Sequence, residues 1–391
     1  MKIIHISDIH IGAKLGRHSQ NPDIKKALSH ISGFCAAENV DLLLIAGDIF
    51  DSYNPSGESE DIYYNFLNNV SAAGIAIAII AGNHDNHERL CAPAGFLKRH
   101  NIMISVNNPQ NDYQPFEFEI KGEKISIAPV AYVYDAQLLD TAEYDTETEA
   151  AAAYSAAYCG VVKAAAAKCR APIKILMAHA FFAGAKNCGS ERNIQRGNTL
   201  LADASIFLSD FKYCAFGHLH RCQKIAENAC YSGSIIPVSI DEAKHRKKMI
   251  LIDTAALSAD GGIKLIDIPE FSVYKNITGD FEKVYSEISM LQNAYVSLIF
   301  TEALNLERQD AILKTARDNG IKIVSQAFDI KTLHGANDMD ALEMSRLSIP
   351  SLFDEYLKVS GNEDETLSIK FKEIILQCES ITETEKGGGG E

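Results

Sequence analysis

The chain has 391 residues, of which 47% are hydrophobic and 23% charged, and it carries a formal net charge of −15. This composition is typical of globular proteins and excludes a disordered or fibrous chain, and at roughly 150 residues per domain the length predicts more than one domain. The negative charge argues against a free-standing nucleic-acid binder, which is normally basic. An enzyme that meets nucleic acid through a local patch, a metal or a partner remains compatible with it.

Other features of the sequence indicate where the protein works. No apolar run approaches the roughly 18–20 residues of a membrane helix. The N-terminus, MKIIHISDIHIG, has neither the apolar stretch nor the cleavage site of a signal peptide. The nine cysteines form no CxxC pair, which indicates buried thiols in a reducing compartment. We therefore expect a cytoplasmic protein with no membrane contact.

Five apolar runs, each ending in a short polar cluster, predict the strands that carry the functional site. Because the runs are apolar throughout rather than alternating, we expect strands that are covered on both faces. The helices between them indicate an α/β sheet, in which ligands gather at the carboxyl ends of strands. The runs and their polar ends are 2–7 with Asp8 and His10, 42–46 with Asp48, 75–81 with Asn83 and His84, 173–178 with His179, and 213–216 with His218 and His220.

Besides a helix at 86–99, three helices are predicted in this part of the chain. The first has Asn21 as its cap and Pro22 in its first turn, and its apolar residues repeat from Ile24 to Cys35 at helical spacing. A second helix has an apolar side between Ile62 and Val70. The alanine-rich stretch 149–168 predicts a long helix with a scaffold role.

The pattern changes near residue 270, which divides the chain into a main domain, residues 1–270, and further segments. Residues 271–332 predict strand, helix, strand, helix and strand, a small α/β module. Residues 333–349 are predicted to be a linker. Residues 350–378 carry two short amphipathic helices, and 379–391 form a flexible polar tail that ends in GGGGE.

The polar clusters supply a set of candidate metal ligands. Carboxylate and amide oxygens mixed with imidazoles are typical of a site for Mn²⁺, Fe²⁺, Zn²⁺ or Co²⁺. They do not match a thiolate site or an all-oxygen calcium site. The set is too large for one tetrahedral ion and suffices for two ions if one carboxylate bridges them. With two carboxylates the loaded site stays positive, which suits a phosphodiester. The candidate ligands are Asp8, His10, Asp48, Asn83, His179, His218 and His220.

Isolated histidines are weak evidence, because a lone histidine is more often an ordinary core or surface residue than a ligand. His5, His30, His100 and His245 are assigned to that ordinary class. The five clusters together, in order and each at the end of an apolar run, favour the metal site.

Six motifs, SDIHIG, AGDIFD, AGNHD, AHAFF, FGHLHR and YSGSIIPVSIDEA, resemble those of the calcineurin-like metallophosphoesterases, and more closely those of the bacterial SbcD nucleases. The resemblance covers roughly residues 1–270 and is weaker beyond. It implies a four-layer α/β sandwich of two mixed sheets flanked by helices, with a small α/β cap domain that contacts DNA. It also implies a nuclease of DNA repair, recombination and replication, a 3′→5′ exonuclease on duplex ends and an endonuclease on single strands and hairpins.

The resemblance also implies a role for each site residue. One metal would be held by Asp8, His10, Asp48 and His220, and the other by Asp48, Asn83, His179 and His218, with Mn²⁺ as the usual activator. His84 would lie beside the metals and give a proton to the leaving oxygen. Asp85 either orients His84 or caps the helix expected at 86–99. Archaeal relatives have a histidine where this chain has Asp51, so the role of that histidine is not carried over.

Substrate contacts are expected from two loops beside the polar clusters. Lys14, Arg17 and His18 lie in the loop 12–21, and Lys186, Arg192 and Arg196 lie in the loop 183–198. They suit contacts to a phosphate backbone, and ordinary solvated loop charge explains each of them equally well. The run KHRKK at 244–248 either meets DNA or forms a solvated turn before a strand.

Two other functions compete with the nuclease. The same fold also serves phosphoesterases of small molecules or proteins, and a scaffold can keep the fold after losing its metals. The added module at 272–332 and the C-terminal helices favour the nuclease over the phosphatase, because a simple phosphatase needs neither. The complete ligand set argues against the scaffold.

Two protein partners are expected. A homodimer through helices 59–71 and 88–99 would bury Tyr63, Phe66, Phe96 and Leu97. The alternative is that these residues pack on the sheet within one chain as ordinary core. The helices in 350–378 carry two apolar stripes, and such faces suit docking onto a partner. The resemblance implies that the partner is the coiled-coil base of an SbcC-type ATPase, and the alternative is that the helices fold back onto 272–332. The stripes are Leu352, Phe353, Tyr356 and Leu357, then Phe371, Ile374, Ile375 and Cys378.

Overall fold

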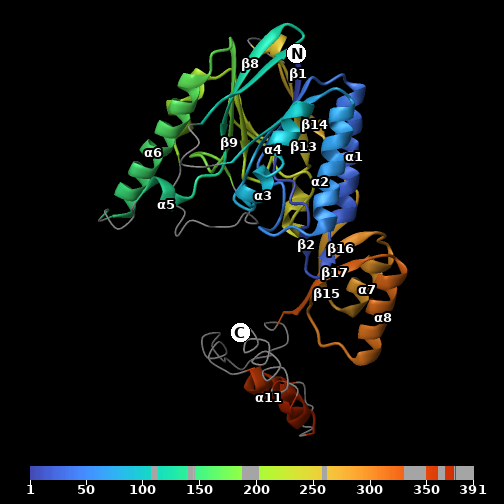
Figure 1. The fold of residues 1–391 in the computed structure, drawn as a ribbon. Helices are drawn as coiled ribbons and strands as arrows, with labels where there is room; N and C mark the ends of the chain where they lie inside the picture. Colours follow the sequence, from blue (N-terminus) through green and yellow to red (C-terminus); the bar gives the residue numbers. More distant parts are fainter. Residues whose placement is uncertain are drawn as a thin grey trace, which may run out of the picture. The chain divides into compact units, whose positions relative to one another are not determined.

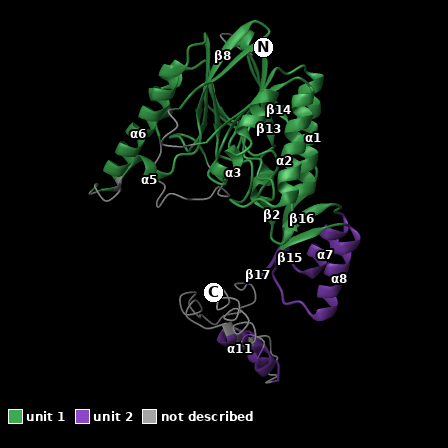
Figure 2. Cartoon of the chain, in the orientation of Figure 1, with its two compact units in different colours: residues 1–276, 291–297, 320–324 green, residues 277–290, 298–319, 325–391 purple. Residues whose placement is uncertain are grey.

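The computed structural model describes residues 1–106, 113–139, 144, 146–186, 202–257, 262–329, 349–359, 366–373 and 375. Within them the chain divides into two compact units (Figure 2). The first holds residues 1–276, 291–297 and 320–324, and the second holds 277–290, 298–319 and 325–391. No helix in the described ranges is long and apolar enough to cross a membrane.

The first unit contains two six-stranded mixed sheets (Figure 1). One has the order β14-β13-β1-β4-β5-β6. Strands β1, β4, β5 and β6 are parallel neighbours, and at the other edge β13 pairs antiparallel with both β1 and β14. The strands are β1 (Lys2–Ile6), β4 (Leu42–Ala46), β5 (Ala76–Ile80), β6 (Ile102–Ser105), β13 (Lys248–Asp253) and β14 (Ile263–Asp267).

The second sheet has the order β11-β12-β10-β9-β8-β7. Strands β8, β9, β10 and β12 are parallel, and antiparallel strands close both edges. The strands are β7 (Phe116–Ile120), β8 (Glu123–Val130), β9 (Ile173–His179), β10 (Tyr213–Gly217), β11 (Gln223–Ala226) and β12 (Ala229–Tyr231).

The two sheets pack face to face. Alternate residues of β9 and β10 point to opposite sides of their sheet, and those on one side share a core with the first sheet. Ile175, Met177 and Ala215 join the core that also holds β1, β4 and β5. Leu176 and Phe216 join a second core on the other face of the sheet, with side chains of α6 (Glu147–Lys168). The helices α1 (Asn21–Ala37) and α2 (Gly57–Ala72) cover the outer face of the first sheet (Figure 1). The predicted four-layer sandwich is therefore confirmed.

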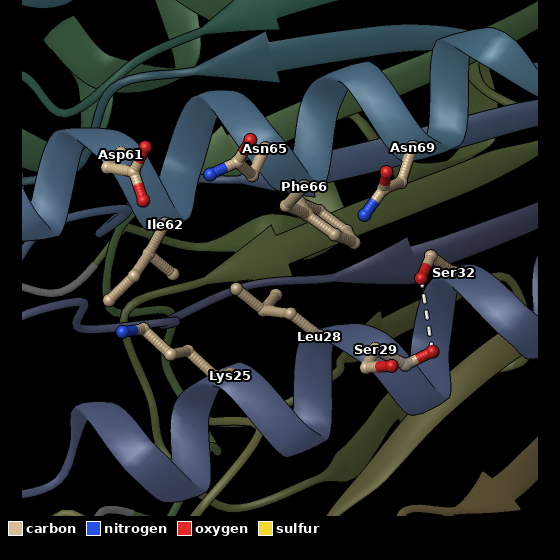
Figure 3. A pocket seen from close by; sticks show the side chains of 9 residues that line it. All are labelled: Lys25, Leu28, Ser29, Ser32, Asp61, Ile62, Asn65, Phe66 and Asn69. Atoms are coloured by element: carbon tan, nitrogen blue, oxygen red, sulfur yellow. Dashed lines mark hydrogen bonds between the residues drawn. The ribbon is translucent and has the colours of Figure 1, made fainter.

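Helices α1 and α2 lie side by side, and a pocket of about 310 Å³ separates part of their facing surfaces (Figure 3). Leu28 of α1 points toward Ile62 and Phe66 of α2 across it, and Ser32 donates a hydrogen bond to the Ser29 carbonyl within α1 at 3.0 Å. None of the candidate metal ligands lines this pocket.

Short elements connect the sheets. The hairpin β2 (Lys14–Leu15) and β3 (His18–Ser19) precedes α1, and one-turn 3₁₀ helices occur at several loops. The remaining short helices are α3 (His87–Cys91), α4 (Ala94–Leu97) and α5 (Asp135–Leu138), and the 3₁₀ helices are Lys98–His100, Ala204–Ile206, Leu208–Asp210, Ile240–Lys244 and Thr254–Ala256.

Two local predictions are wrong. Gln20, not Asn21, is the residue before α1, and the Asn21 side chain instead accepts a hydrogen bond from the Gly12 N–H at 2.9 Å. The helix expected at 86–99 is two short helices, because Pro93 between them has no N–H to continue a helical ladder. Asn86 caps the first of them by accepting from the Arg89 N–H.

The predicted strand and helix order after residue 270 is confirmed. Strands β15 (Val273–Gly279), β16 (Ala294–Phe300) and β17 (Lys322–Phe328) form a three-stranded sheet, with α7 (Phe281–Ser289) and α8 (Leu306–Asp318) between them in sequence. Farther on, α11 (Ile349–Val359) is the first of the two C-terminal helices, and residues 366–373 form the second. Most of the predicted linker and all of 379–391 lie outside the described residues.

Candidate metal centre

The carboxyl ends of five central strands meet at one place, and this brings the predicted ligands together. Strands β1, β4 and β5 are parallel neighbours in one sheet, and β9 and β10 are parallel neighbours in the other. Contacts between the sheets close the site: the His179 ring donates from Nδ1 to the Ala46 carbonyl at 2.8 Å, and the His218 N–H donates to Asp8 at 2.9 Å. All seven predicted ligands therefore lie in one cluster, in which six are buried and His218 is half-buried.

The backbone at these strand ends is strained. Asp8, His10 and Asp48 have φ values of 51°, 51° and 50°, and His218 has a φ of 99°. Residues other than glycine rarely adopt this region, and they persist in it only where the surrounding structure holds them. Such strain is concentrated at functional sites, which favours a ligand-binding role for this cluster over a purely structural one.

Two glycines let the strand ends approach closely. A Cβ on Gly217 would lie 1.9 Å from the Ala46 carbonyl oxygen and 2.8 Å from Nδ1 of His179. A Cβ on Gly82 would lie 2.1 Å from Oδ1 of Asp48. Because no larger residue fits at either place, both glycines fix the spacing between the loops that carry the ligands.

The ligand atoms converge in groups small enough to hold metal ions. Within each group the atoms lie within 4.8 Å of one another. The three groups are Asp8 with His10 and His220, Asp8 with Asp48 and His179, and His10 with Asp48 and His84. Asp8, His10 and Asp48 each belong to two of the groups, so each lies where it can face two ions.

The remaining two candidates complete the cluster. The Asn83 amide oxygen lies 3.1 Å from Nε2 of His179 and 3.0 Å from Nδ1 of His218. Oxygen and imidazole nitrogen atoms thus face a common centre, which is the donor set that suits a divalent transition metal. How the ligands divide between the ions stays a prediction, because His84 also belongs to one group.

The histidine rings are held in the orientation that metal binding requires. In His179 and His84 the Nδ1 atom faces a carbonyl oxygen, of Ala46 at 2.8 Å and of Asp51 at 2.9 Å. A carbonyl only accepts, so Nδ1 carries the proton, and Nε2 of a neutral ring keeps its lone pair. The residues present therefore fit a metal centre.

Charge in the cluster is balanced by proton uptake on two histidines. Burial lowers a histidine pKa, but Asp51 and Asp48 outweigh it and raise the pKa of His10 to about 9, and Asp48 and Asp8 do the same for His179. Burial raises the pKa of Asp48, yet the facing histidines lower it well below its usual value. Metal cations would replace these protons.

His84 is placed beside the ligands by its backbone and its ring. Its N–H donates to Oδ1 of Asp48 at 2.9 Å, and its Nδ1 donates to the Asp51 carbonyl at 2.9 Å. The side chain is 8% exposed, so the ring reaches the edge of the cluster. Asp51, to which the sequence assigned no role, also places its carboxylate 3.3 Å from Nδ1 of His10.

Asp85 has neither of the two roles that the sequence predicted, which were to orient His84 or to cap the helix at 86–99. Its carboxylate is fully buried and accepts from the N–H groups of Ile49, Phe50 and Gly82 at 3.2, 2.9 and 2.8 Å. The neighbouring helix has Asn86 as its cap, and the Asp51 carbonyl orients His84. Asp85 therefore joins the loop that carries Asp48 to the loop that carries His84.

Sequence reasoning missed residues that support the ligands. The Ser7 hydroxyl donates to the Asp8 carboxylate and lies 2.8 Å from the Ser232 hydroxyl. Tyr132 stacks on His218 with ring centroids 6.2 Å apart. Ser7 directly precedes a ligand and Ser232 lies in the YSGSIIPVSIDEA motif, but nothing in the local sequence singles out Tyr132.

The candidate DNA contacts are partly described. Lys14, Arg17 and Lys186 are exposed. The His18 ring is half-buried and faces the Ile323 carbonyl at 3.0 Å, so it is engaged within the protein. Arg192 and Arg196 lie outside the described residues.

Much of the basic run at 244–248 is paired with acidic side chains. Lys248 and Arg246 contact Asp267, and Lys244 lies 3.6 Å from Asp241. Lys247 is only 5% exposed and its ammonium contacts Glu242. This pairing favours the structural interpretation of the run over DNA contact.

The fold and the cluster define a class of protein. A family model described as calcineurin-like phosphoesterase matches residues 1–222, which contain all seven candidate ligands. The chain belongs to the calcineurin-like phosphoesterase family.

Its relatives narrow the class to one group within that family, the SbcD proteins. A protein of Bacillus subtilis (strain 168), named as the SbcD component of the nuclease SbcCD, is 27% identical over 97% of this chain and 99% of the relative. The protein of the same name from Rhodobacter capsulatus is 31% identical over 68% of this chain and 69% of its own. The protein of the same name from Staphylococcus epidermidis is 26% identical over 84% of this chain and 86% of its own length.

Proposed function

We propose that this chain is a DNA nuclease that uses two divalent metal ions to hydrolyse phosphodiester bonds. The observation that carries the proposal is the convergence of the seven candidate ligands at the carboxyl ends of five strands from two sheets. When bound, two metal ions activate water and neutralise the charge that develops on the phosphate. The relatives are named as components of the nuclease SbcCD, which supports DNA as the substrate.

The chain's own residues hold the metals and manage the leaving group. Asp8, His10, Asp48 and His220 would hold one ion, and Asp48, Asn83, His179 and His218 the other. His84, whose Nδ1 is bound to the Asp51 carbonyl, would give a proton from Nε2 to the leaving oxygen. Asp85 acts on the site as a structural tie between its loops.

Mn²⁺ is the metal that we propose. The carboxylate, amide and imidazole donors suit a borderline ion that accepts more than four ligands. The resemblance to SbcD nucleases, for which Mn²⁺ is the usual activator, supports the same choice.

The proposed reactions are 3′→5′ exonuclease cleavage at duplex ends and endonuclease cleavage of single strands and hairpins, in cytoplasmic DNA repair, recombination and replication. The exposed Lys14, Arg17 and Lys186, together with Arg192 and Arg196, are the proposed contacts to the DNA backbone. The module at 271–332 is proposed as a cap domain that contacts DNA, next to a nuclease domain at 1–270.

An SbcC-type ATPase is the proposed partner, docked on residues 350–378 through its coiled-coil base. In this region Phe353 stacks on Phe371 with centroids 3.9 Å apart, and the Lys372 ammonium lies 2.7 Å from the Asp354 carboxylate. The two helices thus pack on each other and still expose apolar side chains, with Tyr356 51% exposed and Ile369 56% exposed. Such a face suits a helical partner.

Charge substitutions test this docking surface. Tyr356→Glu with Ile369→Glu should abolish ATPase binding in pull-down and leave metal content and cleavage of short single strands unchanged. Leu306→Glu is the matched control, because Leu306 is an exposed apolar residue of α8, 82% exposed. Unchanged ATPase binding by the double variant would rule out this surface.

A homodimer through α2 and the α3–α4 segment is also proposed, on narrower grounds than the sequence pattern suggests. Tyr63, Phe66 and Leu97 are buried within the single chain, whereas Phe96 is 65% exposed. Light scattering should give the mass of a dimer, and Phe96→Glu should lower it. A wild-type monomer at high micromolar concentration would contradict the dimer.

A side-by-side assay separates the nuclease from a phosphatase of the same family. With Mn²⁺, the protein should cleave labelled duplex and hairpin DNA and hydrolyse p-nitrophenyl phosphate poorly. EDTA should abolish cleavage. Efficient hydrolysis of the small ester without DNA cleavage would assign the chain to the alternative, a phosphoesterase of small molecules or proteins.

A further inference from the structure

A buried carboxylate lies directly behind one predicted metal ligand. Glu242, in the short 3₁₀ helix Ile240–Lys244, is fully buried, and its Oε1 accepts a hydrogen bond from Nδ1 of His220 at 2.9 Å. His220 follows β10, and Glu242 lies at the end of the YSGSIIPVSIDEA motif, which supplies none of the predicted ligands. The two residues are 22 positions apart and come together only in the fold.

The second oxygen of this carboxylate is held by a buried lysine. The Lys247 ammonium lies 2.5 Å from Oε2 of Glu242, and it also donates to the Ser234 hydroxyl at 2.8 Å and to the His220 carbonyl at 3.2 Å. The Val238 N–H donates to the same Oε2 at 3.3 Å. Lys247 therefore binds both the carboxylate and the backbone of the residue that the carboxylate faces.

Stability alone does not explain this buried ion pair. Moving two charges out of water is costly, and apolar residues of similar volume often serve a core as well or better. What an apolar pair would lack is an acceptor for Nδ1 of His220. A charged acceptor fixes the ring orientation, keeps the proton on Nδ1 and makes Nε2 a stronger electron donor.

The ring nitrogen on the other side faces the cluster. Nε2 of His220 lies 3.0 Å from Nε2 of His10, and both residues share a group with Asp8 whose ligand atoms lie within 4.8 Å. His179 provides a contrast, since its Nδ1 donates to a neutral backbone carbonyl, that of Ala46. The acceptor for Nδ1 is therefore a charged carboxylate at His220 and a neutral carbonyl at His179.

We infer that Glu242 is a positioning residue for His220, which it holds with Nε2 toward the metal, and that Lys247 is the counter-ion that lets this carboxylate be buried. The inference rests on the proposed metal function. It assigns the basic residue at 247 to the metal centre instead of to DNA contact.

The test replaces the ion pair as a unit, so that no single buried charge is left without its partner. Glu242→Leu with Lys247→Met should fold and bind Mn²⁺ at the His220 half of the cluster about 10–100-fold more weakly than the wild type, as measured by calorimetric titration. The matched control is Asp41→Leu with Lys121→Met, which removes a carboxylate–lysine pair of 2.7 Å at the opposite end of β4. Its Mn²⁺ affinity should equal that of the wild type.

A spectroscopic readout separates positioning from general destabilisation. In metal-free protein labelled with ¹⁵N-histidine, the wild-type His220 should carry its proton on Nδ1, and the double variant should show a mixture of tautomers. Glu242→Gln with Lys247→Met, which keeps an acceptor oxygen for Nδ1 of His220 but removes both charges, should fold and show an intermediate loss of affinity. Wild-type affinity in both Glu242 variants would overturn the inference. Failure of the wild type to bind Mn²⁺ would overturn the proposed function, and the His220 tautomer would still test the contact.

Discussion

Replacement of Asp85 by asparagine tests whether this residue has a structural or a catalytic role. The carboxylate accepts three backbone hydrogen bonds, from Ile49 and Phe50 after β4 and from Gly82 after β5. Asparagine has almost the same shape, but it offers one acceptor oxygen and turns an NH₂ group toward the remaining N–H donors. The substitution thus breaks the tie between two ligand-bearing loops without creating a cavity.

The expected cost follows from these contacts. Losing one hydrogen bond to a charged group costs about 1.5–3 kcal/mol. Part of this is offset, because burial and the nearby Asp48 already raise the pKa of Asp85 to about 6 and so make its charged form less favourable. We expect Asp85→Asn to lower the free energy of unfolding by about 2 kcal/mol, and the melting temperature by about 3 °C for a unit of this size.

Thermal denaturation and metal content together decide the question. In metal-free buffer the variant should melt earlier than the wild type, and cleavage should fall in proportion to its Mn²⁺ content. Asp41→Asn, a buried carboxylate before β4, is the control that should lose stability but no metal. A variant with wild-type melting temperature and full metal content but little cleavage would refute the structural role and restore a catalytic one.

Three further predictions concern two site substitutions, the pH dependence of metal binding and a buried histidine outside the ligand set. His84→Ala should keep both metals and DNA binding yet lose cleavage by about 10²-fold or more, whereas Asp48→Ala should lose metal; equal metal loss in both would make His84 a ligand. Because the pKa values of His10 and His179 are raised to about 9, metal binding should release protons and weaken as the pH falls below 9, and titrations in buffers of different ionisation enthalpy should show this release. Burial lowers the pKa of His5 to about 3, so below pH 6.5 the unfolded chain binds a proton that the folded chain does not. The contribution of His5 to the free energy of unfolding should therefore fall by about 1.4 kcal/mol for each unit by which the pH is lowered from 6 to 4. His5→Asn should remove this part of the pH dependence, as measured by urea denaturation.

The sequence predicted the site because each of its strands has its own signal. Runs that are apolar throughout mark β1, β4, β5, β9 and β10, and the polar residues at their ends are the ones that the structure brings together. The residues alone did not show that these strands belong to two sheets, because an apolar run does not say which strand it pairs with. The resemblance supplied that part of the fold.

Other features depend on contacts that no local pattern records. Glu242 reaches His220 across 22 residues, and Asp85 binds a loop 35 residues away. Tyr63 and Phe66 suggested an exposed dimer face, but the structure buries them against the first sheet, and only the three-dimensional packing separates these two outcomes.

Metal stoichiometry is the measurement that tests the central claim most directly. After loading with Mn²⁺ and removal of excess metal, elemental analysis should find two Mn²⁺ ions per wild-type chain and at most one per chain of Asp48→Ala, because Asp48 is the ligand that the proposal assigns to both ions. One ion per wild-type chain, or two in the Asp48 variant, would contradict a centre of two metals bridged by Asp48.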